Sequence, residues 1–104
     1  MSPTDRHALI DSFETALREI PSIRRARVGR RVRLGRSYEE LTRVDLPYAA
    51  ILEFDDADGV RAYLDHPAHE EISTRFFAAI EETLIYDFEV TGNADGFRGM
   101  AAIE

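Results

Sequence analysis

The chain has 104 residues, of which 44% are hydrophobic and 32% are charged, and this predicts one globular domain spanning residues 1–104. The absence of cysteine excludes disulfides, thiolate metal sites and cysteine nucleophiles. No apolar run reaches the roughly 18 residues that cross a bilayer, and no secretory signal pattern opens the chain. We therefore expect a cytoplasmic protein with no membrane partner.

The first half of the chain predicts a helix followed by a strand. Ser2-Pro3-Thr4-Asp5 is a helix-start cluster, and apolar residues recur at helical spacing from Leu9 to Ile20. Pro21 ends this helix. Residues 23–33 predict a strand in which apolar residues alternate imperfectly with arginines, and Gly35 to Pro47 form a long polar connection.

The net charge of −7 conceals a basic segment, because seven of the 13 arginines lie within residues 24–36, which contain no acid. This segment lacks the aromatic and glycine-rich interleaving of a single-strand binder, and the acidic remainder of the chain would repel phosphate. We therefore expect no nucleic-acid partner. The basic and acidic surfaces should complement each other within the fold or between subunits.

The second half predicts a central strand, a pair of helices and a further strand. Tyr48–Phe54 is a nearly continuous apolar run, typical of a strand buried on both faces. Asp55-Asp56-Ala57-Asp58 caps a short helix, and Pro67 suits the first position of the next one. Residues 84–90 then alternate between a face with aromatic residues and a face that carries Asp87.

The heptad Tyr63-Leu64-Asp65-His66-Pro67-Ala68-His69 holds two of the three histidines. If Pro67 starts a helix, His69 is its third residue, where first-turn amides and the helix dipole disfavour imidazolium. A neutral His69 can act as a general base or polarise a carbonyl. Tyr63 can donate to a substrate oxygen, and Asp87 can fix the histidine tautomer.

The same residues also have structural interpretations. His66 can cap the helix that Pro67 starts, His69 can bond a carboxylate, and Tyr63 can belong to the core. A metal on His66 and His69 would need a third ligand that nothing in the sequence fixes. No glycine-rich phosphate loop and no Ser-His-Asp signature is present, so we expect neither metal nor cofactor.

The pattern resembles the stress-responsive α/β-barrel family, also called Dabb, from about Leu9 to Glu89. The resemblance rests on Tyr48–Phe54 followed by two aspartates, on Tyr63 through His69, and on residues 85–88. It implies an α+β, ferredoxin-like fold with an antiparallel sheet and helices on one face. It also implies a homodimer, because two subunits of the family join their sheets into a dimeric α+β barrel.

The resemblance implies chemistry as well. In olivetolic acid cyclase, a plant polyketide cyclase of this family, the positions matching Tyr63 and His69 carry an aldol-type cyclisation, and the one matching Asp87 supports the histidine. Two further histidines of that enzyme have no match here. A pocket for a small apolar or aromatic metabolite is implied at Leu9, Ile10, Phe13, Tyr48, Ala50, Leu52, His66, Ile80 and Ile85.

One departure from the family is large, because family members begin with a central strand and this chain begins with a helix. Without that strand, backbone groups on both of its neighbours stay unpaired. Either the chain is truncated, or a strand at 97–103 follows the turn at 91–96 and takes the empty place, as in a circular permutation. We favour the permutation, although the partner subunit could also supply the strand.

Three functions remain as hypotheses. The first is a cofactor-free cyclase or isomerase that uses His69 as base, Tyr63 as hydroxyl donor and Asp87 as orienting group. The second is a stress-related, ligand-binding barrel without catalysis. The third is a structural module whose arginine strand docks an acidic surface. A cavity at His69 with Tyr63 in reach would favour the enzyme.

Overall fold

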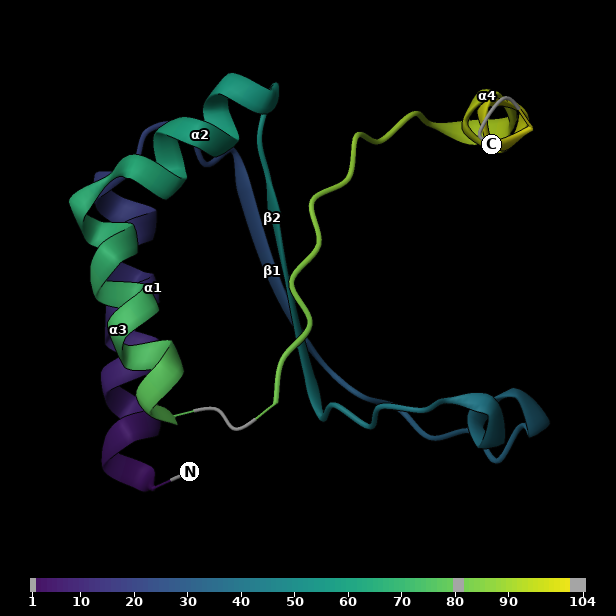
Figure 1. Cartoon of the computed structure of the whole chain (residues 1–104), viewed down its shortest axis with the longest axis horizontal. Helices are drawn as coiled ribbons and strands as arrows, with labels where there is room; N and C mark the ends of the chain where they lie inside the picture. Colours follow the sequence, from purple (N-terminus) through teal and green to yellow (C-terminus); the bar gives the residue numbers. More distant parts are fainter. Residues whose placement is uncertain (1, 80–81, 102–104) are drawn as a thin grey trace.

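The computed structural model describes residues 2–79 and 82–101 (Figure 1). β1 and β2 form an antiparallel, two-stranded sheet in which Arg25 lies opposite Glu53 and Arg30 lies opposite Tyr48. The elements in chain order are α1 (Pro3–Glu19), β1 (Arg25–Arg30), the 3-10 helix η1 (Ser37–Leu41), β2 (Tyr48–Glu53), α2 (Ala57–Asp65), α3 (Pro67–Ala79) and α4 (Asn93–Met100).

The helices α1 and α3 pack along each other and form the helix layer (Figure 1). The Ser2 hydroxyl accepts a hydrogen bond from the Asp5 amide at 3.0 Å and Pro3 takes the first turn, so α1 begins where predicted. The apolar stripe of α1 then meets α3. The buried residues of the core between them are Ala16, Ile20, Ala68 and Ile72.

The junction between α2 and α3 is fixed by two side-chain caps. The Asp56 carboxylate accepts the Gly59 amide at 2.8 Å and starts α2, as the aspartate cluster predicted. At the other end, His66 Nδ1 accepts the Ala68 amide at 3.0 Å. Pro67 has no N–H to offer, so this bond serves the next free amide of α3. The capping interpretation of His66 is confirmed.

We expect His66→Ala to lower the free energy of unfolding by about 1 kcal/mol, the usual effect of losing a helix cap. The Ala68 amide loses its acceptor, and Ala68 itself is buried in the core. His66→Asn should keep most of the stability, because its side-chain oxygen can accept the same bond. Urea unfolding followed by circular dichroism measures both variants. An equal loss in the two would contradict this role for the hydrogen bond.

The C-terminal part departs from the prediction. Residues 82–92 contain no strand, and Asn93–Met100 is helix α4, so the strand predicted at 97–103 is wrong over its described part. Residues 102 and 103 lie outside the described residues. The turn signal at 91–96 starts a helix instead of a hairpin: Gly92 is the N-cap, and Asn93 follows with a φ of 58°, which asparagine tolerates. The permuted sheet is therefore not formed in the described chain.

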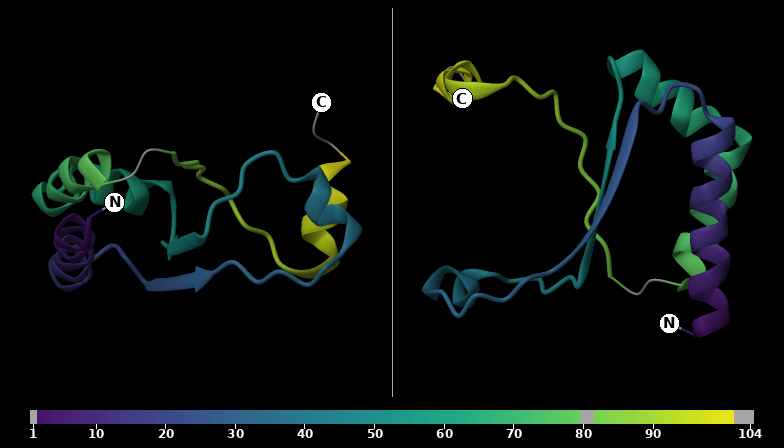
Figure 2. Two further views of the ribbon diagram at one scale, coloured as in Figure 1. Left: turned by 90° about the horizontal axis from the view of Figure 1, so that it is seen from below. Right: turned by 180° about the vertical axis from the view of Figure 1, so that it is seen from behind.

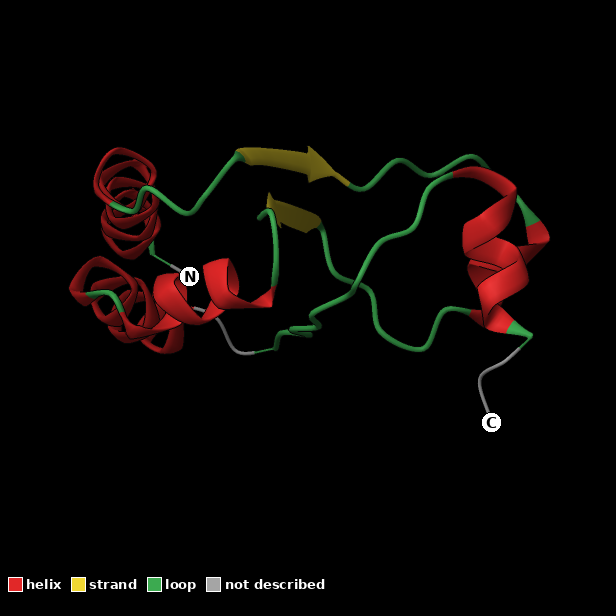
Figure 3. Ribbon diagram, turned by 90° about the horizontal axis from the view of Figure 1, so that it is seen from above, coloured by secondary structure: helices red, strands yellow, loops and turns green. Residues whose placement is uncertain are grey.

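The outer edges of β1 and β2, and the extended residues 82–92, have no hydrogen-bonded strand beside them within the described residues. Figures 2 and 3 show residues 82–92 on the β2 side of the sheet, opposite β1, and no backbone hydrogen bond joins them to β2. The chain is correspondingly open. Its radius of gyration is 16.2 Å, compared with about 13 Å for a compact domain of this length. Its accessible surface is 8967 Å², compared with about 5,900 Å² for a compact monomer of this mass.

Candidate functional site

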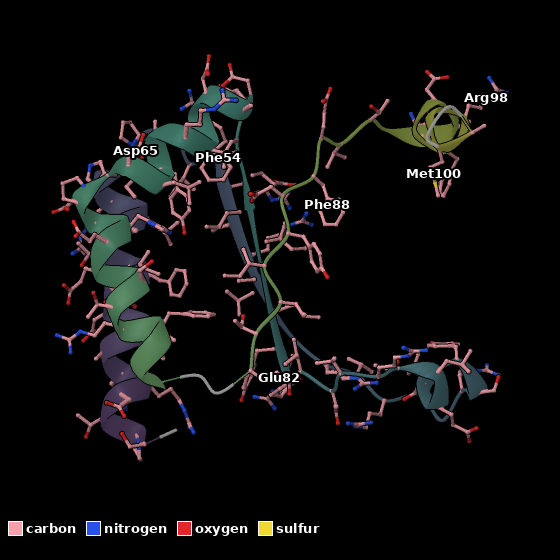
Figure 4. All side chains as sticks on the ribbon, in the orientation of Figure 1. Phe54, Asp65, Glu82, Phe88, Arg98 and Met100 are labelled. Atoms are coloured by element: carbon pink, nitrogen blue, oxygen red, sulfur yellow. The ribbon has the colours of Figure 1, made fainter. Side chains whose placement is uncertain are left out.

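Tyr63 and His69 face each other across the junction of α2 and α3. Their ring centroids are 4.6 Å apart with an angle of 65° between the planes, an edge-to-face contact. Phe54, which follows β2 directly, also contacts Tyr63 at a centroid distance of 5.3 Å (Figure 4). This ring cluster ties the end of β2 to both helices. Phe54 was not among the predicted site residues, because its one signal in the sequence is its place at the end of an apolar run.

The Tyr63 hydroxyl is held in its protonated form. Burial raises the pKa of Tyr63 above its ordinary value of 10.0, and the negative charge of Asp87 raises it further. Asp87 therefore acts on Tyr63 electrostatically from the extended segment, whereas Phe88 of the same segment points away from the helix layer (Figure 4). At neutral pH the phenol can donate a hydrogen bond but cannot act as a base.

We expect one of the four tyrosines to ionise at higher pH than the others in a tyrosinate absorbance titration. Tyr63→Phe should remove that late component. Asp87→Asn should lower the raised pKa of Tyr63 only in part, because burial is the larger cause of the rise. The folded state holds this proton more tightly than the unfolded chain, so stability should fall as the pH rises above about 10. A late component that survives in Tyr63→Phe would contradict the assignment.

Asp87 is the third residue of the predicted catalytic set, and it takes no part in the ring contact between Tyr63 and His69. Within the described residues, the Asp87 carboxylate and the His69 imidazole make no hydrogen bond with each other, and Asp87 is exposed. His69 is half-buried, and its amide donates to the His66 carbonyl at 3.0 Å in the first turn of α3. The single chain thus brings Tyr63 and His69 into contact, whereas Asp87 lies on a segment that has no strand partner among the described residues.

The residues predicted to line a ligand pocket are spread over the helix layer and the extended segments. Ile80 lies outside the described residues. Of the others, Leu9 is buried, Phe13, Leu52 and His66 are half-buried, and Ile10, Tyr48, Ala50 and Ile85 are exposed.

Two open hollows stand out in the part of the chain that the structure describes. One of about 260 Å³ lies on α1 and α3, beside Ser12 and Arg75. The other, of about 440 Å³, lies beside Arg30, Arg31 and Asp45. Neither is lined by Tyr63, His69 or Asp87. Among the described residues, no group of three potential ligands is placed to hold a metal ion.

The arginine segment forms ion pairs with acids of its own chain. Arg24 binds Asp55 at 2.8 Å and Arg27 binds Glu53 at 3.1 Å. Arg31 and Arg33 both bind Asp45. Hydrogen bonds from these two arginines, led by Arg31, hold the pKa of Asp45 below its ordinary value. Basic and acidic surfaces therefore complement each other within the chain, one of the two arrangements predicted.

Comparison with known proteins bears on the fold. No curated protein matches the chain, and no described helix is long and apolar enough to cross a membrane. The crystal structure of a dimeric ferredoxin-like protein of unknown function from Thermobifida fusca YX is similar, with a TM-score of 0.57 and 23% identity over 79% of this chain and 71% of that chain. The sequence model of the stress responsive A/B barrel domain matches residues 1–90. The chain therefore belongs to the stress responsive A/B barrel (Dabb) family and has its ferredoxin-like α+β fold.

Proposed function

We propose that this protein is a homodimeric, cofactor-free cyclase or isomerase-type enzyme that acts on a small carbonyl or aromatic metabolite. The observation that carries the proposal is the contact between Tyr63 and His69, in which a protonated phenol lies against an imidazole. This pair supplies an acid and a base within one substrate's reach. Together they provide what proton abstraction next to a carbonyl requires.

The reaction would need no cofactor. His69 takes a proton from the carbon beside the substrate carbonyl, and the C–H electron pair becomes the enolate. The Tyr63 hydroxyl donates a hydrogen bond to the enolate oxygen, where the negative charge develops. The enolate carbon then attacks a second carbonyl of the same molecule, whose π electron pair moves to its oxygen, and the His69 imidazolium returns the proton to the alkoxide so formed; in an isomerisation the imidazolium returns the proton to another carbon of the substrate instead. Asp87 stabilises the imidazolium formed in the first step.

The homodimer is part of the proposal. The similar structure from Thermobifida fusca YX is described as dimeric, and this chain exposes extended edges and large apolar side chains that a partner could cover. A partner would also add walls around the Tyr63 and His69 rings. We therefore expect the substrate pocket to be complete only in the dimer.

A second candidate is a ligand-binding barrel without catalysis. It is favoured by the position of the two hollows in the described chain, because neither contains Tyr63 or His69. In that case the ring cluster is structural and links β2 to the helices. A bound metabolite would then be retained without being converted.

Hydrogen–deuterium exchange at carbon separates the two candidates. Acetophenone in D2O exchanges its methyl protons slowly, and NMR follows the loss of their signal. The enzyme should accelerate this exchange, and EDTA should leave the rate unchanged. Native mass spectrometry of the purified protein tests for a retained small molecule. A retained ligand with no acceleration across a panel of aryl ketones would favour the binding protein. If the protein neither retains a ligand nor accelerates the exchange, both candidates are contradicted.

A further inference from the structure

The larger of the two hollows lies where the strands leave the sheet on the side of η1. It has a volume of about 440 Å³, and the residues that line it are Arg30, Arg31, Arg33, Asp45 and Pro47. β1 ends at Arg30, whereas α2 and the ring cluster adjoin the other end of the sheet (Figures 1 and 4). The hollow is therefore separate from the contact between Tyr63 and His69.

Two guanidinium groups of this hollow are held together by one carboxylate. Arg31 donates to Oδ1 of Asp45, and Arg33 donates to Oδ2 of the same residue. The backbone also fixes Arg31, because its amide donates to the Pro47 carbonyl at 2.8 Å. The Arg31 side chain is 22% exposed, compared with 60% for Arg33. The pair is therefore positioned before any ligand arrives, which lowers the entropy cost of binding.

The hollow has more positive charge than its own acid neutralises. Three arginines and one aspartate line it, so its net charge is +2. Arg30 makes no ion pair within the described residues. A guanidinium has five N–H donors in a planar fork, and Asp45 accepts one hydrogen bond from each of Arg31 and Arg33. Donors and charge therefore remain for a second oxyanion.

Glu39 of η1 is a second acid that acts on Arg31 electrostatically, but it does not line the hollow. Its Oε1 accepts the backbone amides of Leu34 at 3.0 Å and of Arg36 at 2.7 Å. This carboxylate is therefore satisfied by the backbone of its own loop. Asp45 is the acid with which a ligand would compete for the arginines.

The size and charge of the hollow indicate a small organic phosphate. Its volume lies within the range of roughly 300–1,000 Å³ that small-molecule sites have. Arginine forks match the oxygens of phosphate and carboxylate groups. A phosphate monoester carries a charge of about −1.5 to −2 at neutral pH, which suits the hollow better than a single carboxylate does. A nucleic acid would extend from the hollow onto the acidic remainder of the chain, whereas a small anion would not.

We propose that this hollow binds the phosphate group of a small phosphorylated metabolite. Arg31 and Arg33 donate hydrogen bonds to the phosphate oxygens, and Arg30 supplies further positive charge. The organic part of the ligand lies against Pro47. The proposal does not depend on the candidate enzyme, because the two sites are at opposite ends of the sheet, so a protein without ketone exchange activity would still bind the phosphate.

Isothermal titration calorimetry tests the site with phenyl phosphate as the probe, in about 0.1 M NaCl, where the Debye length is about 10 Å. We expect saturable binding, and Arg31→Gln should weaken it roughly tenfold or more, because it removes hydrogen bonds between charged groups. The matched control is Arg43→Gln. Arg43 is exposed, makes no ion pair in the described chain and does not line the hollow.

Arg43→Gln makes the same change in net charge on the same connection, and it should weaken binding by no more than about threefold, since exposed charges are screened by salt. Circular dichroism checks that both variants fold. A wild-type protein that does not bind phenyl phosphate, or equal affinities in Arg31→Gln and Arg43→Gln, would overturn the proposal.

Asp45→Asn should change the affinity in the opposite direction. It removes the negative charge that competes for Arg31 and Arg33, so phenyl phosphate should bind roughly threefold or more tightly. The backbone bond between Arg31 and Pro47 does not involve the Asp45 side chain and should persist. A distorted loop would not bind more tightly, so this gain separates a binding site from a loss of structure. An affinity equal to or below that of the wild type would overturn the assignment of the two arginines.

Two further probes identify the chemistry of the ligand. Benzoate keeps the ring but has a single negative charge, and it should bind roughly tenfold or more weakly than phenyl phosphate. Inorganic phosphate lacks the ring that would lie against Pro47, and it should also bind more weakly. Benzoate binding as tightly as phenyl phosphate would overturn the assignment to a phosphate group. Inorganic phosphate binding as tightly would overturn the assignment to a phosphorylated metabolite and would identify the free ion as the ligand.

Discussion

Replacement of Ile72 by alanine is expected to lower the free energy of unfolding by about 2–5 kcal/mol. Ile72 is 4% exposed and lies in the small core that joins α1 to α3, beside Ala16, Ile20 and Ala68. Two of these neighbours are alanines, whose short side chains cannot move to fill the space that the lost methyl groups leave. Domains are typically stable by only about 5–15 kcal/mol, so this one substitution should remove a large part of the total.

Two controls isolate burial from helix propensity. Ile72→Val keeps most of the volume and should cost about 0.5–1.5 kcal/mol. Leu17→Ala makes a similar deletion in α1 at a residue that is 46% exposed, and should cost much less. Urea unfolding should be compared at one protein concentration, because dimerisation contributes to the apparent stability. Equal losses in Ile72→Ala and Leu17→Ala would contradict the proposed core.

The helices were predictable from sequence because their signals are local. The Ser2 and Asp56 caps and the proline at position 67 act within one turn of the residues that they fix. A strand needs a neighbour that can be far away in the sequence. Residues 84–90 have the alternation of a strand, yet they are hydrogen-bonded to no strand within the part of the chain that the structure describes.

The helix α4 was missed for a related reason. Glycine and asparagine at positions 92 and 93 fit a hairpin turn as well as a helix start, and the residues after them decide between the two. Asp95 in the first turn and Arg98 in the last suit the dipole of a short helix. The expectation of a strand at 97–103 came from the need to fill the sheet, and residues 97–100 do not fill it in the described chain.

In the candidate site, too, the residues that lie near each other in the sequence were predictable and the distant ones were not. Tyr63 and His69 could be placed together because they are six residues apart in the sequence. The break between α2 and α3 lies between them and turns their side chains towards each other. Asp87 came from its place on one face of a predicted strand, and the pocket residues came from the family resemblance. The relative positions of both depend on a sheet that the described residues leave open. The sequence carried no signal strong enough to add Phe54 to the ring cluster.

Replacement of His69 by alanine should reduce the acceleration of ketone exchange by roughly 10²–10⁴-fold, the usual contribution of a general base. The neighbouring histidine, His66, has its Nδ1 engaged with the Ala68 amide. Tyr63→Phe should reduce the same rate by roughly 10²-fold, since it removes one hydrogen-bond donor to the developing oxyanion. NMR exchange rates at saturating ketone, with the fold checked by circular dichroism, measure both effects.

His66→Asn is the matched control, because it removes the neighbouring imidazole while it keeps a side-chain acceptor for the Ala68 amide. It should therefore lose far less of the exchange rate than His69→Ala. If His69 is the base, its loss should lower the maximal rate more than it weakens ketone binding, because the proton moves only in the transition state. A folded, dimeric His69→Ala protein with the wild-type rate would show that the contact with Tyr63 is structural, and the ligand-binding barrel would then be the better account of this site.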